Sequence, residues 1–281
     1  MKIQTEQLRE LFKKPSPLIL GVCNLTPDSF SDGGLIEDRA AGVDFVQTLF
    51  KNGSDIVDIG GEASGPGSSV ISEEEELQRI IGVVKGAAGF GPLSIDTYKA
   101  SVARSCINSG ASIINDISAL RADPEMVNIA RETGCYVILM FSKEKADHPQ
   151  VSNSPGEYKN LLATIESFLS ERIEFALSSG LEKEKLILDP GMGAFISPEA
   201  KYSWELLDRF EMLVEKFREF PLMVATSRKG FLDIPLAQRD PISQYTAMLA
   251  VDKGARLIRT HNPQMAANFI ETRRKIPSFS Q

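Results

Sequence analysis

Three polar side chains that close short apolar runs are the residues of this sequence best placed to do chemistry: Asp96, Asn115 and Asp189. The carboxyl ends of the strands of a parallel barrel share one mouth, so polar residues that recur there indicate a ligand rather than a role in stability. Acceptors and an amide that converge in one cavity suit a heterocycle with amino, amide and ring N–H edges. One such residue alone would more often be a cap or a turn residue, but three at equivalent positions favour a binding site.

Cations fall at comparable positions near the end of the chain. Lys229 follows the seventh apolar run, and Arg259 and His261 lie two residues apart on the eighth. Side chains two apart on a strand face the same side, so this pair can bind one anion together. An Arg-x-His pair alone is a weak signal, because either side chain can serve a surface role. At a strand end it predicts an oxyanion clamp.

Two polar loops follow the first two apolar runs. Residues 24–34 read NLTPDSFSDGG, which can order around a ligand or act as a plain connector. Residues 60–67 read GGEASGPG, a glycine-rich composition typical of anion cradles in which exposed backbone N–H groups meet phosphate. This second loop matches neither the dinucleotide fingerprint nor the Walker pattern, so it indicates an anion site only together with the other residues.

The periodicity of the chain predicts the scaffold that positions these residues. Short apolar runs alternate with amphipathic segments typical of helices. The apolar runs span residues 18–24, 55–60, 93–96, 112–115, 136–140, 186–189, 222–227 and 256–261. The helical segments include residues 38–52, 72–85, 99–109, 125–133, 158–179 and 203–217. This alternation predicts an α/β fold, a (β/α)8 TIM barrel in a single domain over residues 1–281, with residues 1–16 as an N-terminal lead segment. A doubly wound sheet is the alternative, which counting alone does not exclude.

Local signals support these boundaries. Ser72 followed by Glu75 predicts a capping box, and the acids of residues 73–76 favour the positive end of a helix dipole. Glycines at helix C-terminal positions favour the left-handed conformation there. They are Gly53, Gly110, Gly134, Gly180 and Gly254.

Composition limits the classes of function. With 281 residues, 42% hydrophobic and 25% charged, the chain is long enough for one barrel. A net charge of -7 and the lack of a basic run with interleaved aromatic residues argue against nucleic acid as a partner. No apolar stretch approaches the roughly 18 residues that span a bilayer, so we expect a cytoplasmic protein with no membrane partner. Three widely spaced cysteines and two histidines offer few ligands for a zinc site.

The polar motifs occur in a fixed order along the chain. They read NLTPDSFSDGG at residues 24–34, DIGGE at 58–62, SIDTYK at 94–99, INDI at 114–117, ILDPG at 187–191, SRK at 227–229 and RTH at 259–261. This ordered set resembles the dihydropteroate synthase family over nearly the whole chain. The resemblance implies a pterin-binding barrel, a transferase of folate biosynthesis that condenses (7,8-dihydropterin-6-yl)methyl diphosphate with p-aminobenzoate to give 7,8-dihydropteroate and diphosphate.

The resemblance also implies a mechanism and its catalytic residues. The displacement would be SN1-like: the diphosphate departs first, a resonance-stabilised pterin cation forms, and the arylamine then attacks. Such a scheme needs no protein nucleophile, but it needs Mg2+ and cations on the leaving group and a polar cradle for the developing cation. The catalytic residues would be Lys229, Arg259 and His261.

Binding roles are implied residue by residue. The pterin ring would be held by Asp96, Asn115, Asp189 and Lys229, and the diphosphate by Arg259 and His261, while Ser227 would lie near the p-aminobenzoate carboxylate. The full substrate-binding set would be Ser64, Asp96, Asn115, Asp189, Ser227, Lys229, Arg259, Thr260 and His261. Asn24 would place the Mg2+ ion, with Asp28 nearby.

The chain departs from the family pattern in three places. The second loop reads EASGPG at residues 62–67 where ESTRPG is usual, so Ser64 keeps a hydroxyl but Gly65 removes one expected anion contact. The fifth run ends in Leu-Met-Phe-Ser at residues 139–142 where a Met-His pair is common, and residues 191–196 read GMGAFI. These features resemble acquired sulfonamide-resistance synthases, which motivates the hypothesis that sulfonamide affinity is altered. An inhibition constant like that of an ordinary synthase would contradict it.

Two alternative functions remain open at the level of the sequence. A non-catalytic dihydropterin-binding paralogue would keep the pterin residues and lose turnover with the loop arginine. A methyltetrahydrofolate:corrinoid methyltransferase also uses a pterin-binding barrel, although the first loop and the Arg-x-His pair favour a diphosphate substrate. The family resemblance further implies a homodimer, with residues 263–275 as a candidate surface.

Overall fold

The computed structural model describes residues 2–26, 39–65, 67–146, 149, 151–152 and 154–276. Its eight parallel strands neighbour one another in the order β6-β5-β4-β3-β2-β1-β8-β7. They are β1 (Leu18–Asn24), β2 (Ile56–Gly60), β3 (Leu93–Asp96), β4 (Ile113–Asp116), β5 (Tyr136–Met140), β6 (Leu186–Asp189), β7 (Met223–Val224) and β8 (Leu257–Thr260). A parallel bridge between Leu188 and Leu222 joins β6 to the start of β7. The sheet is therefore closed, which confirms the predicted (β/α)8 barrel and excludes a doubly wound sheet.

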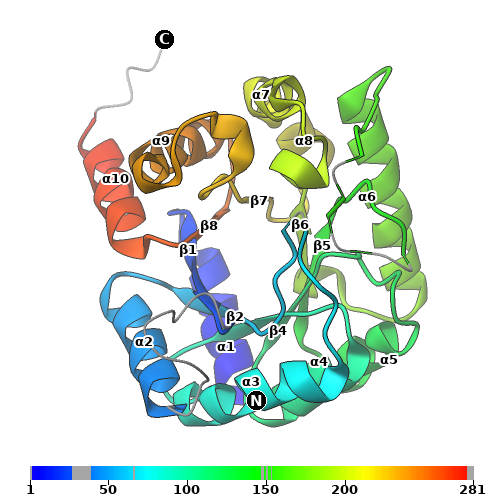
Figure 1. Cartoon of the computed structure of the whole chain (residues 1–281), viewed down its shortest axis with the longest axis vertical. Helices are drawn as coiled ribbons and strands as arrows, with labels where there is room; N and C mark the ends of the chain where they lie inside the picture. The colour runs from blue at the N-terminus through cyan, green and yellow to red at the C-terminus, as the bar shows by residue number, and fades with distance from the viewer. Residues whose placement is uncertain are drawn as a thin grey trace.

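Helices surround this barrel (Figure 1). They are α1 (Lys2–Lys13), α2 (Arg39–Lys51), α3 (Glu73–Ala87), α4 (Ala100–Asn108), α5 (Glu125–Thr133), α6 (Leu161–Ser178), α7 (Ala200–Asp208), α8 (Phe210–Lys216), α9 (Arg239–Asp252) and α10 (Pro263–Lys275). Residues 203–217, expected as one helix, belong to α7 and α8, because the backbone leaves helical geometry at Arg209, where φ is -115° and ψ is 20°. The seventh strand is also shorter than expected, since the chain leaves the sheet after Val224.

The interior of the barrel is apolar at the amino-terminal ends of the strands. Inward-facing side chains there form one cluster with the first helix. Its members are Leu8, Leu18, Leu20, Ile56, Ile113, Tyr136, Ile138, Ile187, Met223 and Leu257. The ring of Phe12 in α1 stacks on that of Tyr136, with centroids 5.5 Å apart and planes 16° apart. Helix α1, formed by the expected lead segment, therefore covers this end, and a ligand reaches the interior from the carboxyl ends of the strands.

The predicted Ser72 cap and helix-end glycines are present, but the Glu75 carboxylate, expected to complete a capping box, pairs with Arg79 Nη2 at 2.5 Å. The Ser72 Oγ accepts the backbone N–H of Glu75 at 3.1 Å, which confirms Ser72 as the N-cap of α3. The five glycines expected in the left-handed region all have positive φ, from 64° at Gly134 to 115° at Gly110. Glu76, however, is 1% exposed and pairs with Lys99, so it does not belong to the solvent-exposed acids of the first helical turn.

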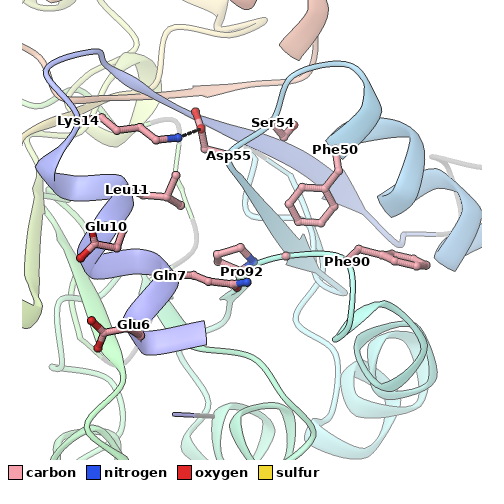
Figure 2. Close-up of a pocket in the computed structure, with 11 residues that line it drawn as sticks. Glu6, Gln7, Glu10, Leu11, Lys14, Phe50, Ser54, Asp55, Phe90 and Pro92 are labelled. Atoms are coloured by element: carbon pink, nitrogen blue, oxygen red, sulfur yellow. Dashed lines mark ion pairs between the residues drawn. The ribbon is translucent and has the colours of Figure 1, made fainter. Parts of the chain in front are cut away.

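A hollow of about 700 Å³ lies beside α1, at the amino-terminal ends of the strands (Figure 2). Its walls are mostly apolar, with Leu11, Phe50 and Pro92 among them, and Lys14 faces Asp55 across it at 3.9 Å. The polar residues at the carboxyl ends of the strands lie at the other end of the barrel. The candidate site therefore lies at that end.

Candidate active site

Polar side chains replace the apolar ones at the carboxyl ends of the strands. The strand register places Asn24 beside Gly60, Gly60 beside Asp96, and Asp96 beside Asn115. Gly60 contributes no side chain, and a Cβ atom there would lie 3.3 Å from the Cβ of Asp96. Asp189 ends β6 beside Met140 of β5. The predicted strand-end residues thus meet around one opening, as parallel strands require.

A cavity of about 620 Å³ occupies this opening. The predicted residues that line it are Asn24, Ser64, Asp96, Ser227, Lys229, Arg259 and His261. Asn115 and Asp189 are 3% and 2% exposed and are buried next to the lining, Asn115 beside Asp96 and Asp189 within electrostatic reach of Lys229 and Arg259. The volume lies in the range typical of small-molecule sites. The structure therefore brings the predicted ring-binding and anion-binding residues together.

Thr260 is the exception among the predicted residues. Its side chain alternates with those of Arg259 and His261, so it projects from the other face of β8. It is fully buried, and its Oγ1 accepts hydrogen bonds from Gln244 Nε2 at 2.7 Å and from the backbone N–H of Asn262 at 3.1 Å. The side chain joins β8 to α9 and is not among the residues that line the cavity, so its contact with substrate stays a prediction.

Arg259 lies between two carboxylates in the barrel. Its Nε donates to Asp58 Oδ2 at 2.7 Å, and its Nη2 donates to Asp96 Oδ2 at 2.6 Å. Burial opposes the charge of Arg259, but the two carboxylates outweigh it and raise the pKa of the guanidinium. Burial raises the pKa of Asp96, which Arg259 opposes and Asp58 reinforces. Arg259, which was predicted to bind an anion, is thus also the counterion of Asp58 and Asp96.

Asp189 and Lys229 have strongly shifted pKa values. Burial raises the pKa of Asp189 to about 6, although the Gly191 N–H, 2.8 Å from its Oδ1, and nearby cations oppose the shift. Burial and the charge of Arg259 lower the pKa of Lys229 to about 8, against the attraction of nearby carboxylates. The Lys229 Nζ also lies 4.6 Å from the centre of the Phe195 ring, a cation–π contact. Shifts of this kind are typical of functional sites.

Ser227 and His261 are hydrogen-bonded to each other. The Ser227 Oγ accepts the backbone N–H of His261 at 3.1 Å and lies 2.9 Å from the ring Nδ1. Burial and the charges of Arg259, Arg228 and Lys229 lower the pKa of His261 to about 3, so the ring is neutral at physiological pH. When the Ser227 hydroxyl donates to Nδ1, the ring proton is on Nε2 and is available to a ligand oxygen.

The loop after β7 turns sharply between two cavity residues. Arg228, between Ser227 and Lys229, has a φ of 59° in the left-handed region. Its guanidinium pairs with Asp240 through Nε–Oδ1 at 2.8 Å and Nη2–Oδ2 at 3.1 Å, and its N–H donates to Ser243 Oγ at 3.0 Å. Left-handed geometry is costly for a residue other than glycine and persists where surrounding contacts fix it. Here those contacts direct Ser227 and Lys229 into the same cavity.

A buried ion cluster anchors the second loop. The Lys99 Nζ donates to Glu62 and, at 2.8 Å, to Glu76 Oε2, and the Tyr98 hydroxyl donates to Glu62 Oε1 at 2.8 Å. Burial alone would lower the pKa of Lys99, but the two carboxylates raise it. Glu62 precedes Ser64 by two residues and lines the cavity. The cluster therefore fixes the start of the loop that carries Ser64.

Sequence reasoning assigned no role to Asp58, Glu62 or Lys99, although all three stand in the quoted motifs. A signal for Asp58 was present, because a charged residue in an apolar run, in phase with Gly60, needs a buried partner. That partner, Arg259, is 201 residues away along the chain. Only the closed barrel brings the two together.

The expected metal residue Asn24 ends β1 and lines the cavity. Asp28, expected beside it, lies outside the described residues. Within the described part of the chain, no group of three or more His, Cys, Asp or Glu side chains could hold a metal ion. Mg2+ is commonly bound by one or two protein oxygens together with substrate phosphates and waters. Asn24 fits such a site if a diphosphate supplies further ligands.

Comparison with known proteins agrees with this geometry. The family model described as pterin binding enzyme matches residues 20–261. The dihydropteroate synthase of Bacillus subtilis is 34% identical over 90% of this chain and 86% of its own length, and that of Escherichia coli K12 is 35% identical over 88% and 86%. The solved dihydropteroate synthase of Xanthomonas albilineans superposes with a TM-score of 0.84 at 32% identity, covering 94% of this chain and 95% of that one.

The chain therefore belongs to the family of pterin-binding enzymes. Within that family it is a dihydropteroate synthase, a transferase of folate biosynthesis, because relatives of that activity align with it along most of its length. The family predicted from the ordered motifs is confirmed.

Proposed function

We propose that the cavity binds (7,8-dihydropterin-6-yl)methyl diphosphate and p-aminobenzoate and joins them through a carbon–nitrogen bond. The observation that supports this most is that Asp96, Lys229 and Arg259 line one cavity, with the buried acceptors Asn115 and Asp189 next to its wall. Solved structures of the Xanthomonas albilineans enzyme contain 4-aminobenzoic acid and 7,8-dihydropteroate, which supports the same substrates here.

The pterin ring lies, in this proposal, against the buried acids. Asp96 and Asp189 accept from its amino and ring N–H groups, and the Asn115 amide complements a neighbouring edge. Lys229 donates to a ring acceptor. The same carboxylates stabilise positive charge as it develops on the pterin, because preorganised groups in a buried site act strongly on developing charge.

The diphosphate lies toward the cations at the mouth. Arg259 offers the N–H groups that its carboxylate partners leave free, and neutral His261 donates from Nε2. Mg2+ would be held by Asn24 together with the diphosphate, where it would neutralise charge on the leaving group. Lys229, Arg259 and His261 are the residues to which we assign catalysis.

The reaction then runs in two steps. The bond between the methylene carbon and the diphosphate oxygen breaks with its electron pair going to oxygen, which leaves a cation delocalised over the dihydropterin. The p-aminobenzoate nitrogen donates its lone pair to the methylene carbon and then transfers a proton to solvent, giving 7,8-dihydropteroate. No protein nucleophile takes part, in agreement with the three cysteines, which are buried free thiols whose pKa values burial raises to about 12, 12 and 11.

The carboxylate of p-aminobenzoate lies near Ser227, with Ser64 of the second loop on the cavity wall. Ser227 already contacts His261, so the two substrates share a hydrogen-bonded boundary. Gly65 lies where the family usually has arginine. A Cβ at Gly65 would meet only the Ser68 Oγ, at 3.9 Å, so the glycine is not required by packing.

The direct experiment is condensation by the purified protein with the pterin diphosphate, p-aminobenzoate and Mg2+, read as dihydropteroate formed and diphosphate released. We expect both products in equal amounts and loss of activity when Mg2+ is chelated. Binding of the pterin diphosphate without product would contradict the proposal and favour the non-catalytic paralogue, which the missing loop arginine makes the main alternative. Activity that depends on cobalamin would instead identify a corrinoid methyltransferase.

We further propose that the protein forms a homodimer. Several large exposed apolar side chains lie on α7, α8 and α9, whereas α10, the candidate surface from the sequence, carries none of those described. They include Trp204, Met212, Ile242 and Tyr245. Light scattering after gel filtration measures the mass, and a monomer at micromolar concentration would contradict the proposal.

Among the described residues, no helix combines the length and apolar character needed to cross a membrane.

A further inference from the structure

Asp58 is a buried charge that contacts two residues of the proposed site and has no assigned role. It lies on β2, is 0% exposed, and faces the inside of the barrel in phase with Gly60. Its Oδ2 accepts the Nδ2–H of Asn115 at 2.9 Å and the Nε–H of Arg259 at 2.7 Å. One carboxylate oxygen therefore accepts hydrogen bonds from Asn115, which is proposed to bind the pterin, and from Arg259, which is proposed to bind the diphosphate.

The contact decides which end of the Asn115 amide is available to a ligand. An amide has a donor end and an acceptor end, and a carboxylate can take only the donor. With Nδ2 bound to Asp58, Oδ1 remains, and it is buried without a hydrogen-bond partner in the described structure. A buried acceptor of this kind is completed by a ligand that brings an N–H group. Rotation of the amide would present a second donor and reject that ligand.

The same oxygen also fixes Arg259. The guanidinium is held through Nε by Asp58 and through Nη2 by Asp96. The orientation of the guanidinium is thus fixed by carboxylates on two neighbouring strands, β2 and β3, although the Arg259 side chain itself is flexible. If Asp58 were removed, the remaining contact to Asp96 would leave the side chain free to pivot.

We propose that Asp58 is a positioning residue, which turns the Asn115 amide so that its oxygen faces an N–H edge of the pterin and which orients Arg259 beside it. This inference rests on the proposed function, since it presumes that a pterin lies against Asn115. The positioning role belongs to Oδ2, which two protein donors occupy, while Oδ1 is buried without a hydrogen-bond partner in the described structure.

Exchange of the two side chains tests the amide orientation. In Asn115→Asp, two acceptors face each other, and we expect the dissociation constant for 6-hydroxymethylpterin to rise about tenfold or more. In the double variant Asp58→Asn with Asn115→Asp, the new amide donates to the new carboxylate, which still offers an oxygen to the pterin, but the same amide nitrogen cannot accept the Nε–H of Arg259. We therefore expect partial recovery, with a dissociation constant at least about threefold below that of Asn115→Asp. A double variant that binds no tighter than Asn115→Asp would overturn the proposal.

A second measurement separates positioning from general stability. Asp58→Ala frees the amide, whereas Ser94→Ala removes a fully buried and unpartnered hydroxyl from the neighbouring position in the register. Binding is measured well below the thermal midpoint of each variant. We expect pterin affinity to fall about tenfold for Asp58→Ala and to change less than about twofold for Ser94→Ala. An unchanged affinity in folded Asp58→Ala, or equal losses in both, would overturn the proposal.

The wild-type protein distinguishes failure of this inference from failure of the proposed function. If the wild type neither binds 6-hydroxymethylpterin nor forms dihydropteroate, the pterin site itself is wrong. If the wild type binds and turns over while the exchange fails to restore binding, only the role of Asp58 is wrong.

Discussion

At the scale of single residues, the site depends on charges held away from water. Burial raises the pKa of Asp189 to about 6 and lowers the pKa of Lys229 to about 8. Both side chains therefore titrate close to neutral pH. Arg259 reduces that cost for the acids around it, since its guanidinium bonds to Asp58 and Asp96. A cationic pterin intermediate would lie against Asp96, which also pairs with Arg259. The ligand and the arginine would therefore share this carboxylate.

Pterin binding should have a pH optimum between these two pKa values. As pH rises through about 6, Asp189 ionises and can accept from the ring, so affinity increases. As pH rises through about 8, Lys229 loses its proton and affinity falls. Calorimetric titration of 6-hydroxymethylpterin from pH 5 to pH 9.5 measures both limbs. Lys229→Arg keeps its charge and should lack the alkaline limb, whereas an unchanged alkaline limb in that variant would assign it to another group.

Stability of the ligand-free protein should depend on Asp189 in the opposite sense. Because its folded pKa of about 6 is above the ordinary value of 3.8, the folded state binds the proton more tightly than the unfolded state. The contribution of Asp189 to stability is therefore largest at low pH and is lost as pH rises from about 4 to about 6. Asp189→Asn removes the cost of ionising this buried carboxyl. The free energy of unfolding, measured in urea, should therefore change less between pH 4 and pH 6 in this variant than in the wild type.

Removal of Arg259 should affect both halves of the substrate. The family resemblance assigned Arg259 to the diphosphate, but the structure shows it bonded to Asp96, a proposed pterin-binding residue. Arg259→Ala leaves two buried carboxylates without their cation, and we expect about 5- to 150-fold weaker binding of free pterin as well as of the diphosphate. His261→Ala is the matched variant, which should weaken only the diphosphate. A free-pterin affinity unchanged in Arg259→Ala would restore the simpler division.

At the scale of elements, the loops after the strands determine substrate contacts. The second loop is anchored at Glu62 by Lys99 and Tyr98 but has Gly65 at the position where an arginine is usual. The loop after β7 is fixed at Arg228 by Asp240 and Ser243. The first of these loops offers no cation at position 65, while the second directs both Ser227 and Lys229 into the cavity.

Gly65→Arg should therefore improve binding of the diphosphate. The space around the glycine accepts a side chain, and an added guanidinium near the cavity can pair with phosphate oxygens. We expect the KM for the pterin diphosphate to fall by about three- to tenfold, with little change for p-aminobenzoate. Steady-state kinetics of Gly65→Arg and of Gly65→Ala, the control for backbone stiffening, measure this. Equal effects in both variants would show that charge is not the cause.

At the scale of the whole molecule, the barrel divides stability and function between its two ends. Helix α1 covers the amino-terminal ends of the strands, while the acids and cations gather at the carboxyl ends. Apolar packing at one end thus supports the polar side chains at the other, whose burial is costly. This division is typical of barrel enzymes.

Leu8→Ala should therefore lower stability without changing the site. Leu8 is fully buried among the inward side chains of the barrel, so its truncation should reduce the free energy of unfolding by about 2–5 kcal/mol. Urea unfolding measures the loss, and KM for both substrates should be unchanged in the folded variant. Gln7→Ala, on the exposed side of the same helix, is the control and should have an effect below about 0.5 kcal/mol. A changed KM in Leu8→Ala would show that α1 also influences the site.

The sequence by itself determined the barrel and the strand ends that carry function. Apolar runs and helical periodicity are local, and four strands begin and end at the residues expected from them: β1, β3, β5 and β6. Asp96, Asn115 and Asp189 could be named because strand ends are readable from the chain. Parallel strands then bring those ends together whatever the details of packing.

Only the tertiary structure decided which of these groups contact one another. The pairing of Arg259 with Asp58 joins residues 201 positions apart, and Thr260 proved to face away from the cavity because side chains alternate across β8. The pKa values of Asp189, Lys229 and His261 also depend on burial and on charges from other strands. Burial and distance between remote residues are properties of the closed barrel, and no local pattern in the sequence contains them.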